Sequence, residues 1–119
     1  MTNFEYRLTE DQQYALYANE QMIRGPFNEV ALALDRDSGV LHKHGDPEMV
    51  LRWHHKTQQA FRANGFDDIA DDLVVIQGRF TLEDLNRAIG NVSYAGHLYR
   101  RLMEEDVSSE HSERFRSRG

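Results

Sequence analysis

The chain has 119 residues, a formal net charge of −6, 39% hydrophobic residues and 29% charged residues, which fits one globular domain and excludes disorder throughout. The acidic excess disfavours broad electrostatic binding to nucleic acid, and the lack of cysteine excludes disulfides, zinc–thiolate sites and thiol catalysis. Because the sequence shows no signal peptide and no membrane-length apolar run, we expect a cytoplasmic protein, in the host cytoplasm if it is viral.

The first third of the chain predicts a short extended segment followed by two helices. Residues 4–8 alternate apolar and polar side chains, as in a strand or an extended arm. Thr9 and Gln12 have the spacing of a capping box, which predicts a helix over 10–24 that ends at a Gly-Pro pair. Apolar residues at helical spacing then predict a second helix over 27–37.

The middle of the chain predicts two more helices. Asp46 followed by Pro47 combines an N-cap with a proline at the first helical position, and the predicted helix runs to Asn64. Helical spacing resumes at Phe66 and continues to a closing glycine. The apolar run at 73–77 also fits a buried strand, so both interpretations remain open there.

The last third predicts a pair of helices and a tail. Thr81 with Asp84 begins a capped helix, and the next helix covers 92–105. The polar residues that follow lack periodicity. We therefore predict one globular domain over 1–106 and a flexible tail over 107–119.

These elements predict a mainly α fold, a compact bundle of about five to six short helices with a short N-terminal strand or extended arm. The alternative is an α+β fold whose small sheet is built from 4–8, 30–34, 40–44 and 73–77.

The densest cluster of charge is an acidic face on the helix predicted after Phe66. Its carboxylates are suited to docking a basic partner, and by helical phase one exposed valine lies among them. The residues of this predicted face are Asp67, Asp68, Asp71, Asp72 and Val75.

The segment 81–105 resembles a helix-turn-helix, with a capped first helix, core positions at Leu85 and Ile89, and a glycine at the turn. Asn86 and Asn91 depart from that pattern, at the helix crossing and in the turn. The resemblance implies a DNA-binding regulator whose second helix presents a polar face formed by Ser93, Tyr94, His97, Arg100 and Arg101.

Two further groups of side chains are candidates for binding. His42, His44 and His54 are the weak candidates for a histidine-based metal site, since imidazole is a common metal ligand. Tyr17 and Tyr94 fall on polar faces by helical phase, and exposed aromatic side chains often anchor protein interfaces. Phe115, among arginines in the tail, is the last candidate for partner binding.

We therefore expect a small, acidic, non-enzymatic protein-binding module that acts as an adaptor, an assembly factor or an inhibitor. Such domains are often encoded by a phage or a mobile element, and they then act on a host system. The expected partner is another protein with a basic surface. Nucleic acid is disfavoured by the net charge, and neither a membrane nor a cofactor is expected. The helix-turn-helix regulator and the histidine metal site are the second and third hypotheses.

Overall fold

The structure, a computed structural model, describes residues 3–112 of the chain and the side chains of residues 3–104. It is an α+β fold with two three-stranded antiparallel sheets and four helices, so the predicted helical bundle is wrong. In chain order the elements are β1 (Phe4–Leu8), β2 (Tyr14–Ala18), β3 (Gln21–Phe27), β4 (Val30–Asp35), β5 (Leu41–Gly45), α1 (Pro47–Ala63), α2 (Asp67–Asp72), β6 (Leu73–Gly78), α3 (Leu82–Gly90) and α4 (Val92–Ser112).

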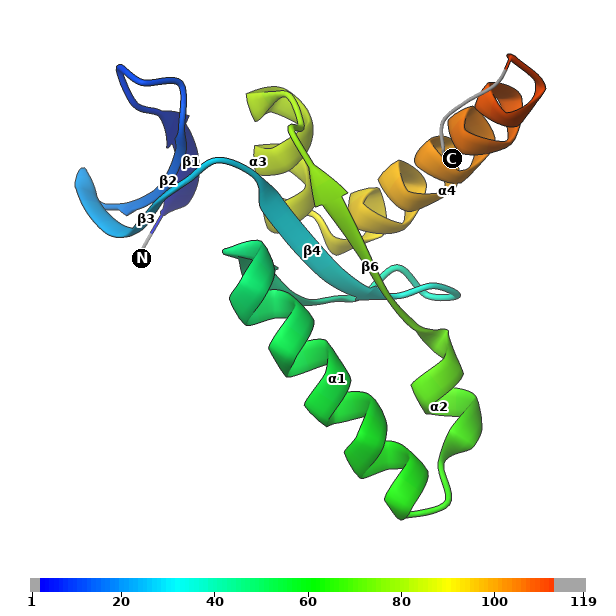
Figure 1. Ribbon diagram of the computed structural model, residues 1–119. Coiled ribbons are helices and arrows are strands. Elements are labelled where there is room, and N and C mark those ends of the chain that lie inside the picture. The colour runs from blue at the N-terminus through cyan, green and yellow to red at the C-terminus, as the bar shows by residue number, and fades with distance from the viewer. Residues whose placement is uncertain (1–2, 113–119) are drawn as a thin grey trace.

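The first sheet is a meander in which β1, β2 and β3 pair in that order (Figure 1). It occupies the residues for which we predicted a helix over 10–24. The Thr9 hydroxyl accepts a hydrogen bond from the backbone N–H of Gln13 at 3.2 Å, within the loop that joins β1 to β2. Threonine hydroxyls bond nearby backbone groups in turns as well as at helix starts, so the capping-box pattern was ambiguous.

The turn between β2 and β3 has only two residues, because Ala18 pairs with Gln21. Both turn residues adopt a positive φ, 50° at Asn19 and 70° at Glu20. A two-residue hairpin loop with both φ angles positive is a type I′ turn, which matches the twist of the flanking strands. The Asn-Glu pair lacks the glycine that usually marks this turn, so the local signal for the hairpin is weak.

The second sheet has the order β5-β4-β6, with β4 antiparallel to both neighbours. Five consecutive residues of β4, Val30 to Leu34, are buried. The helix predicted over 27–37 is wrong, because a central strand that is covered on both faces has an unbroken apolar run that resembles helical spacing. The strands of the α+β alternative are present as β1, β4, β5 and β6, but they are divided between two sheets.

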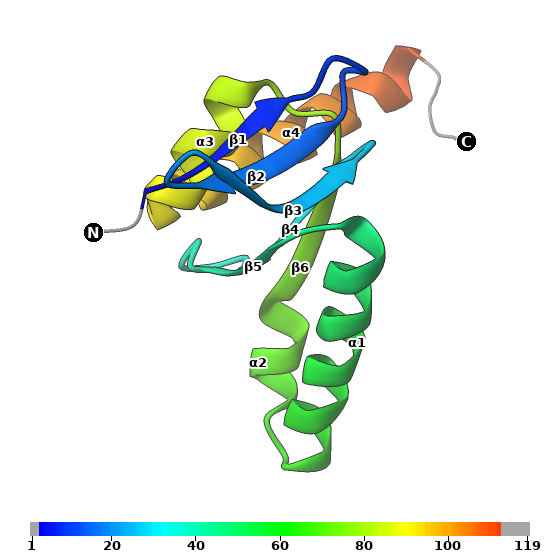
Figure 2. The same cartoon turned by 90° about the vertical axis from the view of Figure 1, so that its left-hand side faces the viewer.

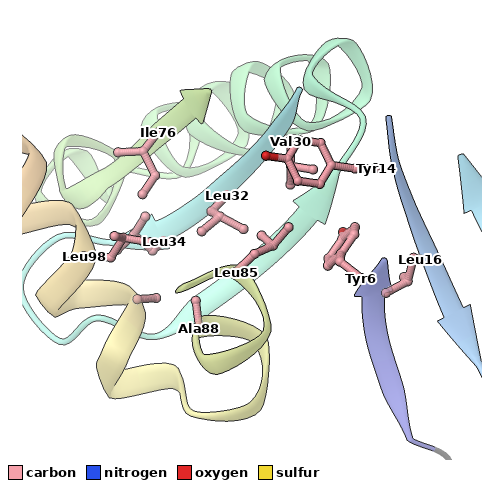
Figure 3. Close-up of a cluster of buried hydrophobic side chains, with 11 residues drawn as sticks. Tyr6, Tyr14, Leu16, Val30, Leu32, Leu34, Ile76, Leu85, Ala88 and Leu98 are labelled. Atoms are coloured by element: carbon pink, nitrogen blue, oxygen red, sulfur yellow. The ribbon is translucent and has the colours of Figure 1, made fainter. Parts of the chain in front are cut away.

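Side chains of β4 alternate between two cores. Ala31 and Ala33 form a small cluster with Val50 of α1, and their short side chains allow the helix to approach the sheet closely. Figure 3 shows the larger cluster on the opposite face, where α3, α4 and the first sheet meet β4. Its buried members are Tyr6, Tyr14, Leu16, Val30, Leu32, Leu34, Ile76, Leu85, Ala88, Ala95 and Leu98.

Three helices begin where the sequence predicts. Asp46 and Pro47 precede and open α1, and Thr81 caps α3 by accepting a hydrogen bond from the Asp84 N–H at 3.1 Å. The long helix α4 begins at Val92 and continues to Ser112, across the predicted boundary between domain and tail. The helix predicted from Phe66 is correct only for α2, because the chain then enters β6.

One close contact fixes α4 against the turn between β4 and β5. A Cβ on Gly96 would lie 2.9 Å from the Cα of Gly39, which is shorter than side chains tolerate. Gly39 also has φ +75°, which favours glycine. Both positions therefore require glycine for the helix to pack on the turn.

The molecule is extended in two directions. Helices α1 and α2 project from the sheets as a helical arm, as Figures 1 and 2 show. The radius of gyration is 15.3 Å, compared with about 13 Å for a compact domain of this length. The arm therefore presents its far end, residues 60–69, away from the body of the fold. We call this end the arm tip.

Candidate functional site

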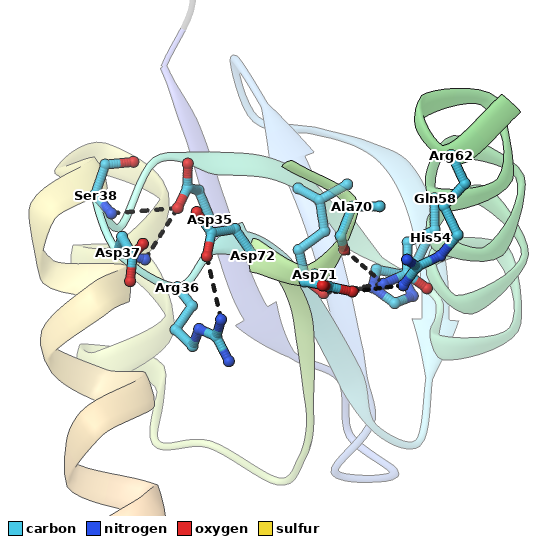
Figure 4. Close-up of polar contacts among 11 residues, drawn as sticks. Asp35, Arg36, Asp37, Ser38, His54, Gln58, Arg62, Ala70, Asp71 and Asp72 are labelled. Atoms are coloured by element: carbon cyan, nitrogen blue, oxygen red, sulfur yellow. Dashed lines mark hydrogen bonds and ion pairs between the residues drawn. The ribbon is translucent and has the colours of Figure 1, made fainter. Parts of the chain in front are cut away.

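The four aspartates predicted to form one acidic face are placed at different points of α2, and two of them are neutralised within the chain. Arg62 of α1 contacts Asp71 at 2.7 Å, and Arg36, after β4, contacts Asp72 at 3.2 Å (Figure 4). Asp67 lies 3.9 Å from Arg62, and Asp68 forms no ion pair with any described side chain. Arg62 is thus shared between Asp71 and Asp67, so among these four aspartates the charge that is least balanced within the described residues lies at Asp68 and in part at Asp67, both on the arm tip.

An apolar hollow of about 360 Å³ lies at the same tip, between α1 and the start of α2. Phe66 forms its edge with 52% of its surface exposed, and Phe61 packs edge-to-face against it with ring centres 6.4 Å apart. The hollow is lined by Lys56, Thr57, Ala60, Phe61, Asn64 and Phe66.

Phe66 also borders a second hollow, of about 380 Å³, on its other side. This second hollow carries the two aspartates and the exposed side chain of Ile69. An exposed ring therefore stands between an apolar surface and an acidic one. Large exposed apolar groups with polar surroundings are typical of protein interaction sites.

Hydrogen bonds from α1 hold α2 in this position. The Gln58 side chain donates to the carbonyl oxygen of Ala70 at 2.7 Å, and His54 Nε2 lies 2.9 Å from that of Leu73 (Figure 4). Because a carbonyl only accepts, His54 carries its proton on Nε2. The backbone N–H of Phe66 donates to the Phe61 carbonyl at 2.8 Å, which fixes the bend at the tip.

Val75, predicted to be exposed among the aspartates, lies elsewhere. It belongs to β6 and packs, partly buried, against the cluster of Ala31, Ala33 and Val50. The helical phase used for the prediction does not apply to a strand, so Val75 is separated from the arm tip.

The polar face predicted on the second helix of the helix-turn-helix is engaged with α3. Asp84 accepts hydrogen bonds from the Tyr94 hydroxyl and from Arg101, both at 2.7 Å. The bond from Tyr94 and the bond from Arg101 hold the pKa of Asp84 below its usual value. His97 lies beside the Tyr94 ring and Arg100 is exposed, so the group predicted together is split between intramolecular contacts and solvent.

The two remaining predicted aromatics are Tyr17 and Phe115. Tyr17 is on β2, where the Arg7 guanidinium covers its ring at 4.5 Å from the centroid. Tyr17 therefore lies on a sheet and not on a helix face. Phe115 lies outside the described residues.

The three candidate metal ligands have separate roles. His42 stacks on Trp53 with ring centres 6.2 Å apart, and His44 Nδ1 lies 2.6 Å from the Tyr6 hydroxyl, while His54 contacts the Leu73 carbonyl. Across the described part of the chain, no three metal-ligating side chains gather in a site.

The sequence pattern does not predict the exposure of Phe66. Its helical spacing favours a buried apolar stripe, but Phe66 follows a glycine with φ +84° that turns the chain between two helices, and its side chain is exposed. A single sequence carries only a weak signal for an exposed ring.

None of the helices in the described residues is both long and apolar enough to cross a membrane. Searches of protein-family models, of curated proteins and of solved structures find no match to this chain.

Proposed function

We propose that this chain is a protein-binding module and that the arm tip is where it anchors its partner. The observation that carries the proposal is the exposed ring of Phe66 between the apolar hollow and the two aspartates. Aromatic side chains bordering hollows are frequent anchors of protein interfaces. The arm projects from the fold, so a partner reaches the tip without touching the sheets (Figure 2).

The chemistry of the tip defines the partner. Apolar side chains of the partner would fill the hollow beside Phe66 and Phe61, and basic side chains would face Asp67 and Asp68. A basic amphipathic segment of a protein, presenting both kinds of side chain, meets these requirements. Charge complementarity of this kind speeds association and makes it sensitive to salt.

In this proposal the chain acts by occupying a surface of its partner, as an adaptor, an assembly factor or an inhibitor does. The proposal assigns binding, and no catalysis, to the arm tip. The intramolecular pairs of Asp71 and Asp72 keep the base of α2 fixed, while the tip aspartates remain for the partner.

The test is capture of partners from a lysate of the source organism with matched variants. Phe66→Ala and the double variant Asp67→Asn/Asp68→Asn are expected to lose a protein that the unchanged chain retains. Because Phe66 and both aspartates are exposed, these changes should leave the fold intact, and a far-ultraviolet spectrum checks this.

Met22→Ala is the control, because Met22 is similarly exposed (46%) but lies on β3, far along the chain from the arm. It should retain the same protein. Cross-linking should place the contact on a segment of the partner that is both basic and apolar, and retention should fall steeply with salt. Equal retention by all variants, or retention that is independent of salt, would overturn the proposal.

A further inference from the structure

Another hollow, remote from the arm tip, lies where the two sheets meet. Its volume is about 240 Å³, below the range of about 300–1,000 Å³ typical of pockets for drug-sized ligands. Arg24 comes from β3 of the first sheet and the other lining residues from β5 of the second. We call it the β3–β5 hollow, lined by Arg24, His42, Lys43 and His44.

His44, one of the lining residues, contacts a buried tyrosine. Tyr6 of β1 is 1% exposed, and its hydroxyl lies 2.6 Å from Nδ1 of His44. Burial raises the pKa of Tyr6, so its hydroxyl keeps its proton. Burial, with the charges of Arg24 and Lys43, lowers the pKa of His44 to about 4, so the imidazole is neutral near pH 7.

The Tyr6 hydroxyl forms no other hydrogen bond among the described residues, so it donates its proton to Nδ1 of His44. A neutral imidazole then carries its single proton on Nε2. The described residues form no other hydrogen bond with this ring. His44 Nε2–H is thus a fixed donor for a ligand in the hollow.

Charge in the hollow is unbalanced. Within residues 3–104, neither Arg24 nor Lys43 has a carboxylate within 4.0 Å, although the whole chain carries a net charge of −6. Apart from Arg100, every other arginine with a described side chain donates to a carboxylate or to a backbone carbonyl. Arg24 and Lys43 therefore line the hollow without an anionic partner among the described residues.

The lining residues come from different elements. A Cβ on Gly45 would lie 3.8 Å from Arg24 Nη1 and 4.0 Å from the Tyr6 hydroxyl, so the guanidinium lies beside the end of β5, near the buried pair. His42 is held by its stack on Trp53 of α1. Positive side chains and a fixed N–H donor, with no carboxylate among the lining residues, suit an anion and repel a metal ion.

We propose that the β3–β5 hollow binds a phosphate group, with the Arg24 fork and the Lys43 ammonium contacting its oxygens and His44 Nε2–H donating to one of them. Guanidinium and ammonium groups are the usual partners of phosphate oxygens in proteins. The small volume favours inorganic phosphate or the phosphate of a small monoester.

The test is a titration followed by nuclear magnetic resonance of the histidine rings and backbone amides of the full chain at low ionic strength. Inorganic phosphate is expected to shift the His44 Nε2–H signal in a saturable way at concentrations up to about 10 mM. Adenosine monophosphate and adenosine distinguish free phosphate from a phosphate monoester as the natural ligand. A monoester site binds adenosine monophosphate more tightly than inorganic phosphate and does not bind adenosine.

Arg24→Gln and Lys43→Gln should each weaken phosphate binding by about tenfold or more, because each removes a charge-assisted contact. Arg100→Gln is the matched control, since it removes an exposed arginine that also makes no ion pair with a described side chain. The amide spectra of the variants verify the fold. The proposal is wrong if phosphate and the monophosphate cause no saturable shift, or if Arg24→Gln and Arg100→Gln have equal effects.

Discussion

Strands β4 and β3 lie close together in the chain but have opposite environments. Every residue of β4 from Val30 to Leu34 is buried, whereas β3 is exposed along its length except at Phe27. The sheet of β4 is covered on one face by α1 and on the other by α3, α4 and the first sheet. In the sheet of β3, the buried side chains are those of Tyr6, Tyr14 and Leu16, which reach the core, and of Ala15.

This difference indicates that the two sheets are stabilised in different ways. Burial of apolar surface dominates around β4. The first sheet depends more on specific polar contacts with the rest of the fold, which are Tyr6 with His44, the Tyr6 backbone with Asn86, and the Tyr14 hydroxyl with the Phe80 carbonyl. Substitutions that separate apolar packing from these polar contacts test the comparison.

The largest effect is expected at the centre of β4. Leu32→Ala leaves a cavity between β4 and the helices, because Leu32 is fully buried, and should lower the free energy of unfolding by about 3–5 kcal/mol. Met22→Ala on β3 should change it by less than about 0.5 kcal/mol. Urea unfolding of both variants measures the difference, and comparable losses would refute the contrast between the two strands.

The next effect is the pH dependence of the contact between the sheets. The pKa of His44 is about 4 in the folded chain and about 6.5 when unfolded, so the unfolded chain binds more protons between these values. Stability should therefore fall as the pH drops from about 6.5 to 4, with His44 contributing on the order of 2–3 kcal/mol of that loss.

His44→Gln separates this contribution from that of the carboxylates, which both proteins share. The amide oxygen still accepts from the Tyr6 hydroxyl but does not titrate. Unfolding measured at several pH values should show the unchanged chain losing more stability than His44→Gln as the pH falls from about 6.5 to 4. Parallel curves would show that His44 is not responsible.

Asn86 provides the polar contact between α3 and the edge of the first sheet. Its Oδ1 accepts from the Tyr6 N–H at 2.6 Å, and its Nδ2 donates to the Tyr6 carbonyl at 3.0 Å. Asn86→Ala leaves both backbone groups without a partner and should cost about 2 kcal/mol of unfolding free energy. Asn64→Ala, which removes an exposed amide bonded to the Ala60 carbonyl, should cost much less in the same unfolding experiment. Similar costs would mean that the contact at the sheet edge has no special role.

The sequence predictions were accurate where local contacts decide the structure and wrong where distant segments decide it. The starts of α1 and α3 were predictable because a proline after Asp46, and a threonine three residues before Asp84, act through local hydrogen bonds and backbone geometry. Strand β4 was not, since its burial on both faces depends on segments far away in sequence. The alternation of alanine with larger residues from Val30 to Leu34 was the available signal.

The candidate site was predictable only in part. Asp67 and Asp68 were recognised from their density alone. That Arg62 and Arg36 neutralise Asp71 and Asp72 depends on tertiary contacts that no local pattern encodes. The same holds for Arg24, which meets His44 only because two separate sheets pack together.

The smallest effect is expected at the turn between β2 and β3, where Glu20 adopts φ 70°. A side chain is strained in this conformation and glycine is not, so Glu20→Gly should raise the Tm by about 2–4 °C. The substitution also removes the exposed ion pair with Arg7. Glu20→Gln removes that pair while keeping the strain, and it should leave the Tm unchanged or slightly lower in the same thermal scan. If Glu20→Gly lowers the Tm as Glu20→Gln does, then the backbone of this turn is not strained. The stability of the exposed sheet would then depend more on its surface charges than on its hairpin geometry.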